Sequence, residues 1–501
     1  MKKYGYILLF LLILSTLFPA CTSMPTEYLE TIDHAHIFPD YTDITIPPNI
    51  APLNFIVKEE QTSCLVTIQG EKSTLTLKGK KGIHLPMKKW KQLLAESRGS
   101  QLTITIFIKK GKEWIRHRPF YWHVADEIID PYLVYRLIEP TYANWNQMGI
   151  YQRCLENFKE SAIIQNDMTD GNCMNCHSFC LQNENKMVFH MRKNKGEITR
   201  LNTTTPHTAS FFVYPAWHPS GEIIAFTVNK THQSFYMADN KRSEIYDSAS
   251  DILLYDIVKN EIFTSHLLSS ENTLETYPVF APDGKKLFFC TAPAEEKLPE
   301  NVNRIKYSLC SIDFDPETQT FGQETDTLIS SSQINKSIVF PRVAPDGKHL
   351  LFSTLNFGCF PCWSREADIY IYSFAQKNFR PLDAVNSTSS EGYTTWSSNS
   401  RWIIVSSRRL DDGFSRPFIA YINKEGIATK AFLLPQENPE IYTYTLKSFN
   451  LPELIKNKVP VNAYQIQDVA TSEEIMQVNV RGKEKIIGEH KQADTDHNQI
   501  N

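Results

Sequence analysis

The chain lacks the features that would place it in several simple classes. Its 52 Lys and Arg against 56 Asp and Glu give a formal net charge of −4, so no basic excess points to nucleic acid. Glycine is scarce, at 19 residues against 27 prolines, which excludes a collagen-like chain. Hydrophobic residues still make up 42 %, which excludes a wholly disordered chain. The length of 501 residues predicts about three domains, at roughly 150 residues each, unless repeats use the length differently.

Common catalytic signatures are also absent. The sequence contains no glycine-rich phosphate loop, no His-Glu-x-x-His pair and no nucleophile elbow. A hydrolase therefore has no positive support.

The first residues have the pattern of an export signal. Two lysines precede an apolar run over 7–14, which is too short for a comfortable membrane span. Ala20 then precedes Cys21, and this arrangement resembles the lipobox of bacterial lipoproteins. We predict removal of residues 1–20, lipidation of Cys21 and a tether over 21–40, with ordinary secretory cleavage as the alternative. The mature chain is then expected in the bacterial cell envelope, anchored to a membrane and facing the periplasm, with the outer membrane favoured.

Export allows disulfides to form, so the ten cysteines are interpreted in that setting. Four stand alone and are predicted to be buried apolar residues or disulfide members: Cys64, Cys154, Cys290 and Cys310. Cys359 and Cys362 form a pair with no histidine after it. For this pair a local disulfide or two buried thiols is favoured over a redox role.

Residues 41–129 alternate in the manner of β-strands. Leu102, Ile104 and Ile106 are expected on one face of a strand, with threonines between them on the other face. A short helix is expected only over 88–96. We predict a small β-sandwich that serves as a spacer or docking module.

From 130 to 460 the chain repeats a turn motif. Each copy precedes a short apolar strand, and the four copies are Tyr214–Gly221, Tyr277–Gly284, Phe340–Gly347 and Tyr393–Ser400. Where the turn ends in Pro-Asp-Gly, proline presets φ and glycine permits a positive φ, so the next strand starts in a fixed register. Units of this kind cannot bury both faces alone and stack around an axis.

These turns resemble the WD40-like repeats of TolB-type β-propellers over about residues 186–450. The resemblance implies an all-β chain, with the N-terminal β-sandwich followed by a β-propeller. Weaker strand starts at Leu133 and Met187 bring the expected number of blades to six, with five or seven as alternatives. Residues 461–501 are expected to form a polar tail.

One motif carries chemistry. Cys173-Met-Asn-Cys176-His177 matches the C-x-x-C-H pattern of c-type haem attachment, in which two thiols add to haem vinyl groups and the histidine binds the iron. The composition gives the pattern a chance expectation of roughly 0.006. We expect it in a haem c attachment loop at about 165–186, inserted in the propeller. A disulfide between the two cysteines, or a zinc site that includes Cys180, would use the same residues.

The sequence leaves the sixth iron ligand open. We favour His190, because residues 187–192 resemble the segment that follows the haem motif in exported bacterial propeller proteins. The alternatives are three methionines: Met168, Met187 and Met191. On a strand, His190 shares its face with Val188.

These features together predict a membrane-anchored c-type cytochrome with one haem on a TolB-like propeller. It would transfer electrons and bind a redox partner or another envelope protein, and nucleic acid is not expected as a partner. A haem enzyme of the peroxidase or small-molecule reductase type is one alternative, and an envelope scaffold without haem is the other. An electron carrier or binding protein is favoured over a catalyst.

Overall fold

The structure is a computed structural model, and it describes residues 24–139, 147–193, 196–202, 208–209, 213–238, 241–471 and 478–481. The predicted signal segment and Cys21 lie outside the described residues. The chain forms two compact units. The first comprises residues up to 43, 52–124 and 435–440, and the second comprises 44–51, 125–434 and residues from 441 onward.

Among its described residues, the first unit contains strands and one helix. One sheet includes β1 (Leu29–Glu30), β5 (Ser63–Gln69), β6 (Thr74–Gly79), β8 (Gln101–Lys110), β9 (Glu113–Arg116) and β10 (Phe120–Val124). A second sheet contains β2 (Ile37–Phe38), β4 (Phe55–Val57) and β7 (Gly82–Ile83). Helix α2 (Met87–Glu96) coincides with the expected helix, and its Trp90 ring contacts Trp122 of β10 edge to face at 5.8 Å. The two sheets agree with the predicted β-sandwich.

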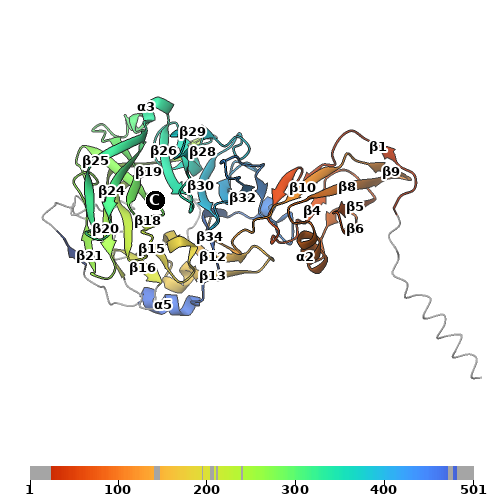
Figure 1. The fold of residues 1–501 in the computed structure, drawn as a ribbon, viewed down its shortest axis with the longest axis horizontal. Coiled ribbons are helices and arrows are strands. Elements are labelled where there is room, and N and C mark those ends of the chain that lie inside the picture. Colours follow the sequence, from red (N-terminus) through yellow and green to blue (C-terminus); the bar gives the residue numbers. More distant parts are fainter. Residues whose placement is uncertain are drawn as a thin grey trace, which may run out of the picture. The chain divides into compact units, whose positions relative to one another are not determined.

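The second unit contains six sheets of four or five strands, arranged around a common centre (Figure 1). The first three sheets are β11 (Tyr132–Ile138), β12 (Gly149–Cys154), β13 (Glu160–Gln165) and β34 (Ser448–Ile455); β14 (Met174–Phe179), β15 (Met187–Lys193), β16 (Gly196–Asn202) and β17 (Thr208–Ala209); and β18 (Val213–Trp217), β19 (Ile223–Ala238), β20 (Lys241–Asp256), β21 (Glu261–Phe263) and β35 (Asn479–Val480). The all-β propeller predicted from the repeats is confirmed.

The other three sheets follow one another along the chain. They are β22 (Thr273–Phe280), β23 (Lys286–Pro293), β24 (Ser308–Asp315) and β25 (Thr320–Ile329); β26 (Ser337–Val343), β27 (His349–Leu355), β28 (Asp368–Ser373) and β29 (Asn378–Pro381); and β30 (Glu391–Trp396), β31 (Trp402–Ser407), β32 (Arg416–Tyr421) and β33 (Phe432–Leu433). Shorter elements are β3 (Ile44–Ile46), η1 (Asn166–Thr169), η2 (Cys180–Gln182), η3 (Val302–Arg304), α3 (Ser331–Ile334), η4 (Pro361–Trp363), α4 (Ile441–Tyr444) and α5 (Ala463–Thr471).

The first sheet closes the ring. It takes β11, β12 and β13 from the start of the unit and β34 from near its end, and β34 pairs antiparallel with β11. The start and the end of the unit are thereby joined within one sheet through backbone hydrogen bonds.

The repeated turns have the backbone expected from the sequence. Gly221, Gly284 and Gly347 have φ of 69°, 73° and 68°, and Ser400 has a φ of 60° in the fourth copy. Glycine adopts this left-handed conformation at little cost. The turns therefore place the inner strand of each sheet in the same register relative to the next strand.

Part of the expected polar tail is folded. Helix α5 packs Ile466 and Ala470 into an apolar cluster with the first and second sheets. The polar composition of residues 461–501 did not predict this contact, because only one face of α5 is apolar. Within the described ranges, no helix combines the length and the hydropathy needed to cross a membrane.

Candidate functional site

The C-x-x-C-H motif lies on the inner strand of the second sheet. Strand β14 contains Met174 to Phe179, so the motif is not in a loop between sheets as expected. The pairing of β14 with β15 shifts between Asn175 and Ser178, which leaves a bulge at Cys176 and His177. Cys176 has a φ of 41° at this bulge. The polar composition of the segment suggested a loop, whereas the strand is imposed by its neighbours in the ring.

Cys176 occupies a position that the other sheets share. Five inner strands carry a non-glycine residue with φ between 41° and 55° at a bulge: Cys176, Tyr214, Tyr277, Phe340 and Leu451. The next residue is proline in four of these strands and His177 in the second sheet. Proline suits a bulge because the position does not need a backbone donor. His177 therefore stands where the repeat elsewhere has proline.

Two tryptophans confirm this register. Nε1 of Trp217 donates to the carbonyl of Ser178 at 3.2 Å, and Nε1 of Trp396 donates to the carbonyl of Arg342 at 3.0 Å. Ser178 and Arg342 each lie two residues after the bulge residue of their own strand. The second sheet thus offers its neighbour the same contact as the fifth sheet offers the sixth.

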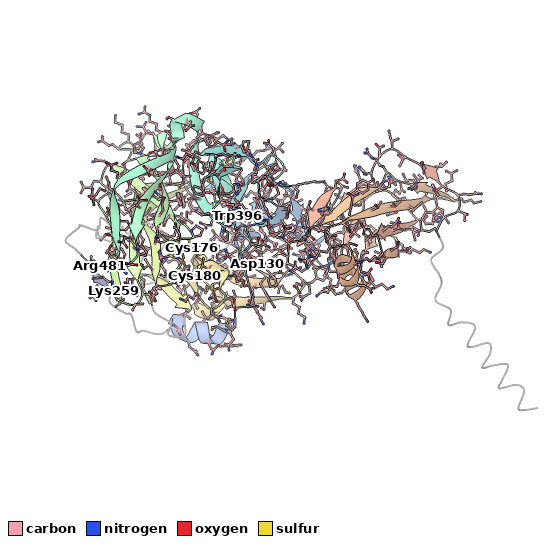
Figure 2. The ribbon with its side chains drawn as sticks, viewed as in Figure 1. Asp130, Cys176, Cys180, Lys259, Trp396 and Arg481 are labelled. Carbon is pink, nitrogen blue, oxygen red and sulfur yellow. The ribbon has the colours of Figure 1, made fainter. Side chains whose placement is uncertain are left out.

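The bulge residues gather around a closed cavity near the middle of the ring, where Figure 2 labels Cys176. Ring centroids are 4.6 Å apart for Tyr214 and Tyr277 and 4.1 Å apart for Tyr277 and Phe340. The cavity that Cys176, His177 and these rings line is about 20 Å³. That volume holds about one or two water molecules.

His177 is buried, and its ring lies near the backbone carbonyls of Leu451 and Val134 without a hydrogen bond of good geometry. The side chain faces this cavity, and only 4 % of the residue is exposed. Burial, reinforced by the charges of Arg136 and Arg342, lowers the pKa of His177 to about 3, although the carbonyls of Leu451 and Val134 oppose the shift. The imidazole is therefore neutral, which is the form that binds a metal.

The two cysteines of the motif have different surroundings. Cys173 packs against the apolar cluster between the first and second sheets, and its Sγ accepts from Nδ2 of Asn175 at 3.1 Å. Cys176 lines the cavity instead. No disulfide joins cysteines among the described residues, and no group of three His, Cys, Asp or Glu there could hold a metal ion. The structure therefore gives neither the disulfide nor the zinc alternative direct support.

His190 lies on the strand next to His177, since it pairs with Asn175 in the register of β14 and β15. His190 is fully buried on β15 and shares its face with Val188, which packs with Trp217 of the third sheet. The alternation expected along this strand is present, since Met187 and Met191 pack on the opposite face. His177 lies toward the first sheet, as its contacts with backbone near Val134 indicate. The assignment of His190 as sixth ligand stays a prediction.

Charged groups missed by the sequence analysis surround His177. Arg342 lies on the inner strand β26 and Glu453 on the inner strand β34, whereas Arg136 lies on β11, the strand next to β34. Burial raises the pKa of Glu453 to about 7 despite the charge of Arg342. Arg342 and Glu453 each lie two residues after a bulge residue, and this register is the signal that could have found them.

The second cysteine pair lies next to the same aromatic cluster. Cys359 accepts at its carbonyl from the hydroxyl of Tyr277 at 2.7 Å, and the Sγ of Cys362 is 3.8 Å from the hydroxyl of Tyr393. Burial raises the pKa of both thiols. Cys359 and Cys362 are therefore two buried thiols, which is one of the two states expected from the sequence. The four cysteines that stand alone in the sequence are buried thiols too: Cys64, Cys154, Cys290 and Cys310.

The donor groups meet one requirement of a covalently attached haem, but the volume of the cavity does not meet the other. Two thiols and a buried neutral histidine are the donors that the group needs. A cavity of about 20 Å³ is far below the roughly 300–1,000 Å³ of sites that enclose larger ligands. A haem held by these residues would thus need a different packing of the rings around the cavity.

No known family model matches the chain, and no curated protein does. Among solved structures, TolB from Acinetobacter baumannii is 12% identical, with a TM-score of 0.42, over 74% of this chain and 85% of its own. The tricorn protease is 11% identical, with a TM-score of 0.33, over 68% of this chain and 34% of its own. The periplasmic gluconolactonase of Pseudomonas aeruginosa is 11% identical, with a TM-score of 0.25, over 60% of this chain and 68% of its own. The propeller is shown by the chain's own sheets, and these likenesses assign it no activity.

Proposed function

We propose that the protein is an exported c-type cytochrome of the bacterial envelope, in which a propeller carries one haem on Cys173 and Cys176 and passes its electron to a partner. The observation that carries the proposal is His177, a buried neutral imidazole at the repeat position where four other sheets have proline. A histidine in that place has no structural need that proline would not meet. Ligation of iron supplies one.

The chain's own residues would contribute attachment, ligation and insulation. Cys173 and Cys176 would each hold the group through a thioether, in which the sulfur is bonded to one vinyl carbon and the thiol hydrogen has gone to the other, so no oxidant would be consumed. His177 would donate a ring nitrogen to the iron, and the aromatic residues of the inner strands would exclude water. The bound group would supply a reversible one-electron change at its iron.

The volume of about 20 Å³ bears on the order of events. His177 is almost fully buried, whereas Cys173 and Cys176 are partly exposed, so what a haem lacks in this packing is the space beside His177 and not access to the thiols. We propose that attachment precedes closure of the ring, while β14 is still open, and that the inner aromatic residues then pack against the haem.

Variants of the motif test attachment directly. The full chain is produced in a host with the c-type haem maturation machinery, and a denaturing gel is stained for haem. We expect the Cys173→Ala/Cys176→Ala variant to lose the stained band. The matched control, Cys359→Ala/Cys362→Ala, removes the second buried pair and should keep it. An unstained band in the unmodified chain would return the protein to the scaffold alternative.

His177→Pro separates ligation from folding. Proline fits the same bulge in four other sheets, so we expect this variant to keep its far-UV circular dichroism and its covalent haem. Loss of the axial nitrogen should change the visible spectrum from low-spin to high-spin iron. An unchanged spectrum would show that His177 is not the ligand.

One observation favours a second candidate. The small, closed cavity is compatible with an envelope scaffold that binds a partner without haem. The haem stain of the unmodified chain decides between the two.

A further inference from the structure

Two arginines meet beside His177 without a carboxylate partner. Arg342 lines the cavity and donates from Nη1 to the carbonyl of Pro341 at 3.3 Å. Arg136 donates from Nη1 to the carbonyl of Met174 at 3.3 Å, and its Nε has no partner. Neither forms an ion pair with a residue that the structure describes.

One acid acts on Arg342 from nearby. Glu453 accepts the backbone N–H of Phe179 at 2.9 Å and forms no ion pair with Arg342, but its charge raises the pKa of Arg342 against the effect of burial. Two guanidinium groups against one carboxyl still leave the surroundings with a net positive charge. Charges surrounded by protein are costly unless they are paired, so this excess favours an anion beside the cavity.

The walls of the cavity favour a small ligand. Tyr214, Tyr277 and Phe340 line it with aromatic carbon, and the volume is about 20 Å³. His177 faces the same space, and its ring nitrogens have no hydrogen bond of good geometry. The site therefore combines a guanidinium on its wall, a second guanidinium nearby and a buried imidazole.

We infer that this cavity binds a small anionic oxygen group, of the carboxylate or oxyanion class, held by Arg342 and Arg136 beside His177. The planar guanidinium matches a carboxylate and can bind it through two parallel hydrogen bonds. The group can come from a free anion or from a carboxylate of the haem. The inference goes beyond the proposed function because it also holds for the chain without haem.

The first arm of the test uses the full chain from a host that lacks the haem maturation machinery. Sodium formate, the smallest carboxylate, is titrated in a calorimeter in chloride-free buffer. We expect Arg342→Gln to weaken formate binding by about tenfold or more, since charge-assisted hydrogen bonds are lost. Arg342→Lys keeps the charge and should retain part of the affinity. Arg136→Gln gives a second measurement should Arg342→Gln fail to fold.

A matched control comes from another arginine of the propeller. Arg380 donates to the carbonyl of Gly426 at 2.7 Å and is not part of the cavity, so Arg380→Gln should bind formate as the unmodified chain does. No formate binding to the unmodified chain would overturn the inference. Equal binding by the unmodified chain and both cavity variants would also overturn it.

The second arm uses the haem-loaded chain and identifies the source of the anion. If a haem carboxylate occupies the arginines, formate no longer binds, and Arg342→Gln shifts the reduction midpoint to a lower potential because a positive charge is lost. If formate still binds, the free anion is the source. Both results support the site. A chain that carries no haem fails the proposed function but leaves the first arm intact, so the two failures are distinguishable.

Discussion

At the scale of single residues, the propeller buries acidic side chains at a cost that depends on pH. Glu275 and Asp251 are 2 % and 4 % exposed, and Oε2 of Glu275 has no hydrogen-bond partner. Burial raises the pKa of Glu275 to about 7 and that of Asp251 to about 6, and the charge of Asp251 adds to the effect on Glu275. Both carboxyls are therefore partly protonated in the folded protein near neutral pH.

The sign of the resulting pH dependence follows from these shifts. Glu275 binds its proton more tightly when folded, so its contribution to stability is complete below about pH 4.5 and is lost as the pH rises through about 7. Glu275→Gln removes that titration. We expect the variant to be more stable than the unmodified chain at pH 8, by up to about 3 kcal/mol, with little difference at pH 4.5. Urea unfolding at the two pH values measures this, and a constant difference between them would contradict the assignment.

At the scale of elements, two copies of the repeated turn differ in their surroundings. A Cβ on Gly284 would lie 2.2 Å from Nε2 of the buried His218, whereas a Cβ on Gly347 would have no atom closer than 3.9 Å. Both glycines have φ near 70°. The pair therefore separates backbone strain from steric conflict in the same turn.

Alanine at each position gives the comparison. Gly347→Ala should cost about 1–2 kcal/mol of unfolding free energy through the left-handed backbone alone. Gly284→Ala should cost a further 1–3 kcal/mol, roughly, because His218 must move. Chemical denaturation of both variants measures the difference. Equal losses would show that His218 yields without cost.

The elements also show which parts of the fold could be predicted from the sequence. The turns at Gly221, Gly284 and Gly347 were predictable because φ preference is a local property of proline and glycine. The placement of Cys176 and His177 on β14 was not, because the bulge there is fixed by pairing with neighbouring strands. The aromatic Phe179, three residues after Cys176, matches Trp217 and marks the same register. Read as a repeat copy, the motif would have been placed on an inner strand.

Residues brought together from distant strands were beyond the sequence. Arg136 and Arg342 are 206 positions apart and approach His177 only because the ring closes through β34. An isolated arginine in a sequence is by default predicted to lie on the surface. The anion site therefore follows from the topology and not from any local pattern.

At the scale of the whole molecule, the proposed function links ring closure to haem attachment. The inner strands surround a space of about 20 Å³, and β34, which follows the other five sheets in the sequence, completes the first sheet. The proposed function therefore implies two packings of the propeller. In one, the aromatic side chains of Tyr214, Tyr277 and Phe340 contact one another, and in the other they pack against haem.

The visible absorption spectrum of the purified chain, reduced with dithionite and referred to protein concentration, tests the central claim most directly. Protein from a host competent in haem attachment should show a Soret band equivalent to one covalent haem per chain. That band should remain with the polypeptide after acid–acetone extraction. A spectrum without a Soret band, or one whose haem is extracted completely, would contradict covalent attachment at Cys173 and Cys176.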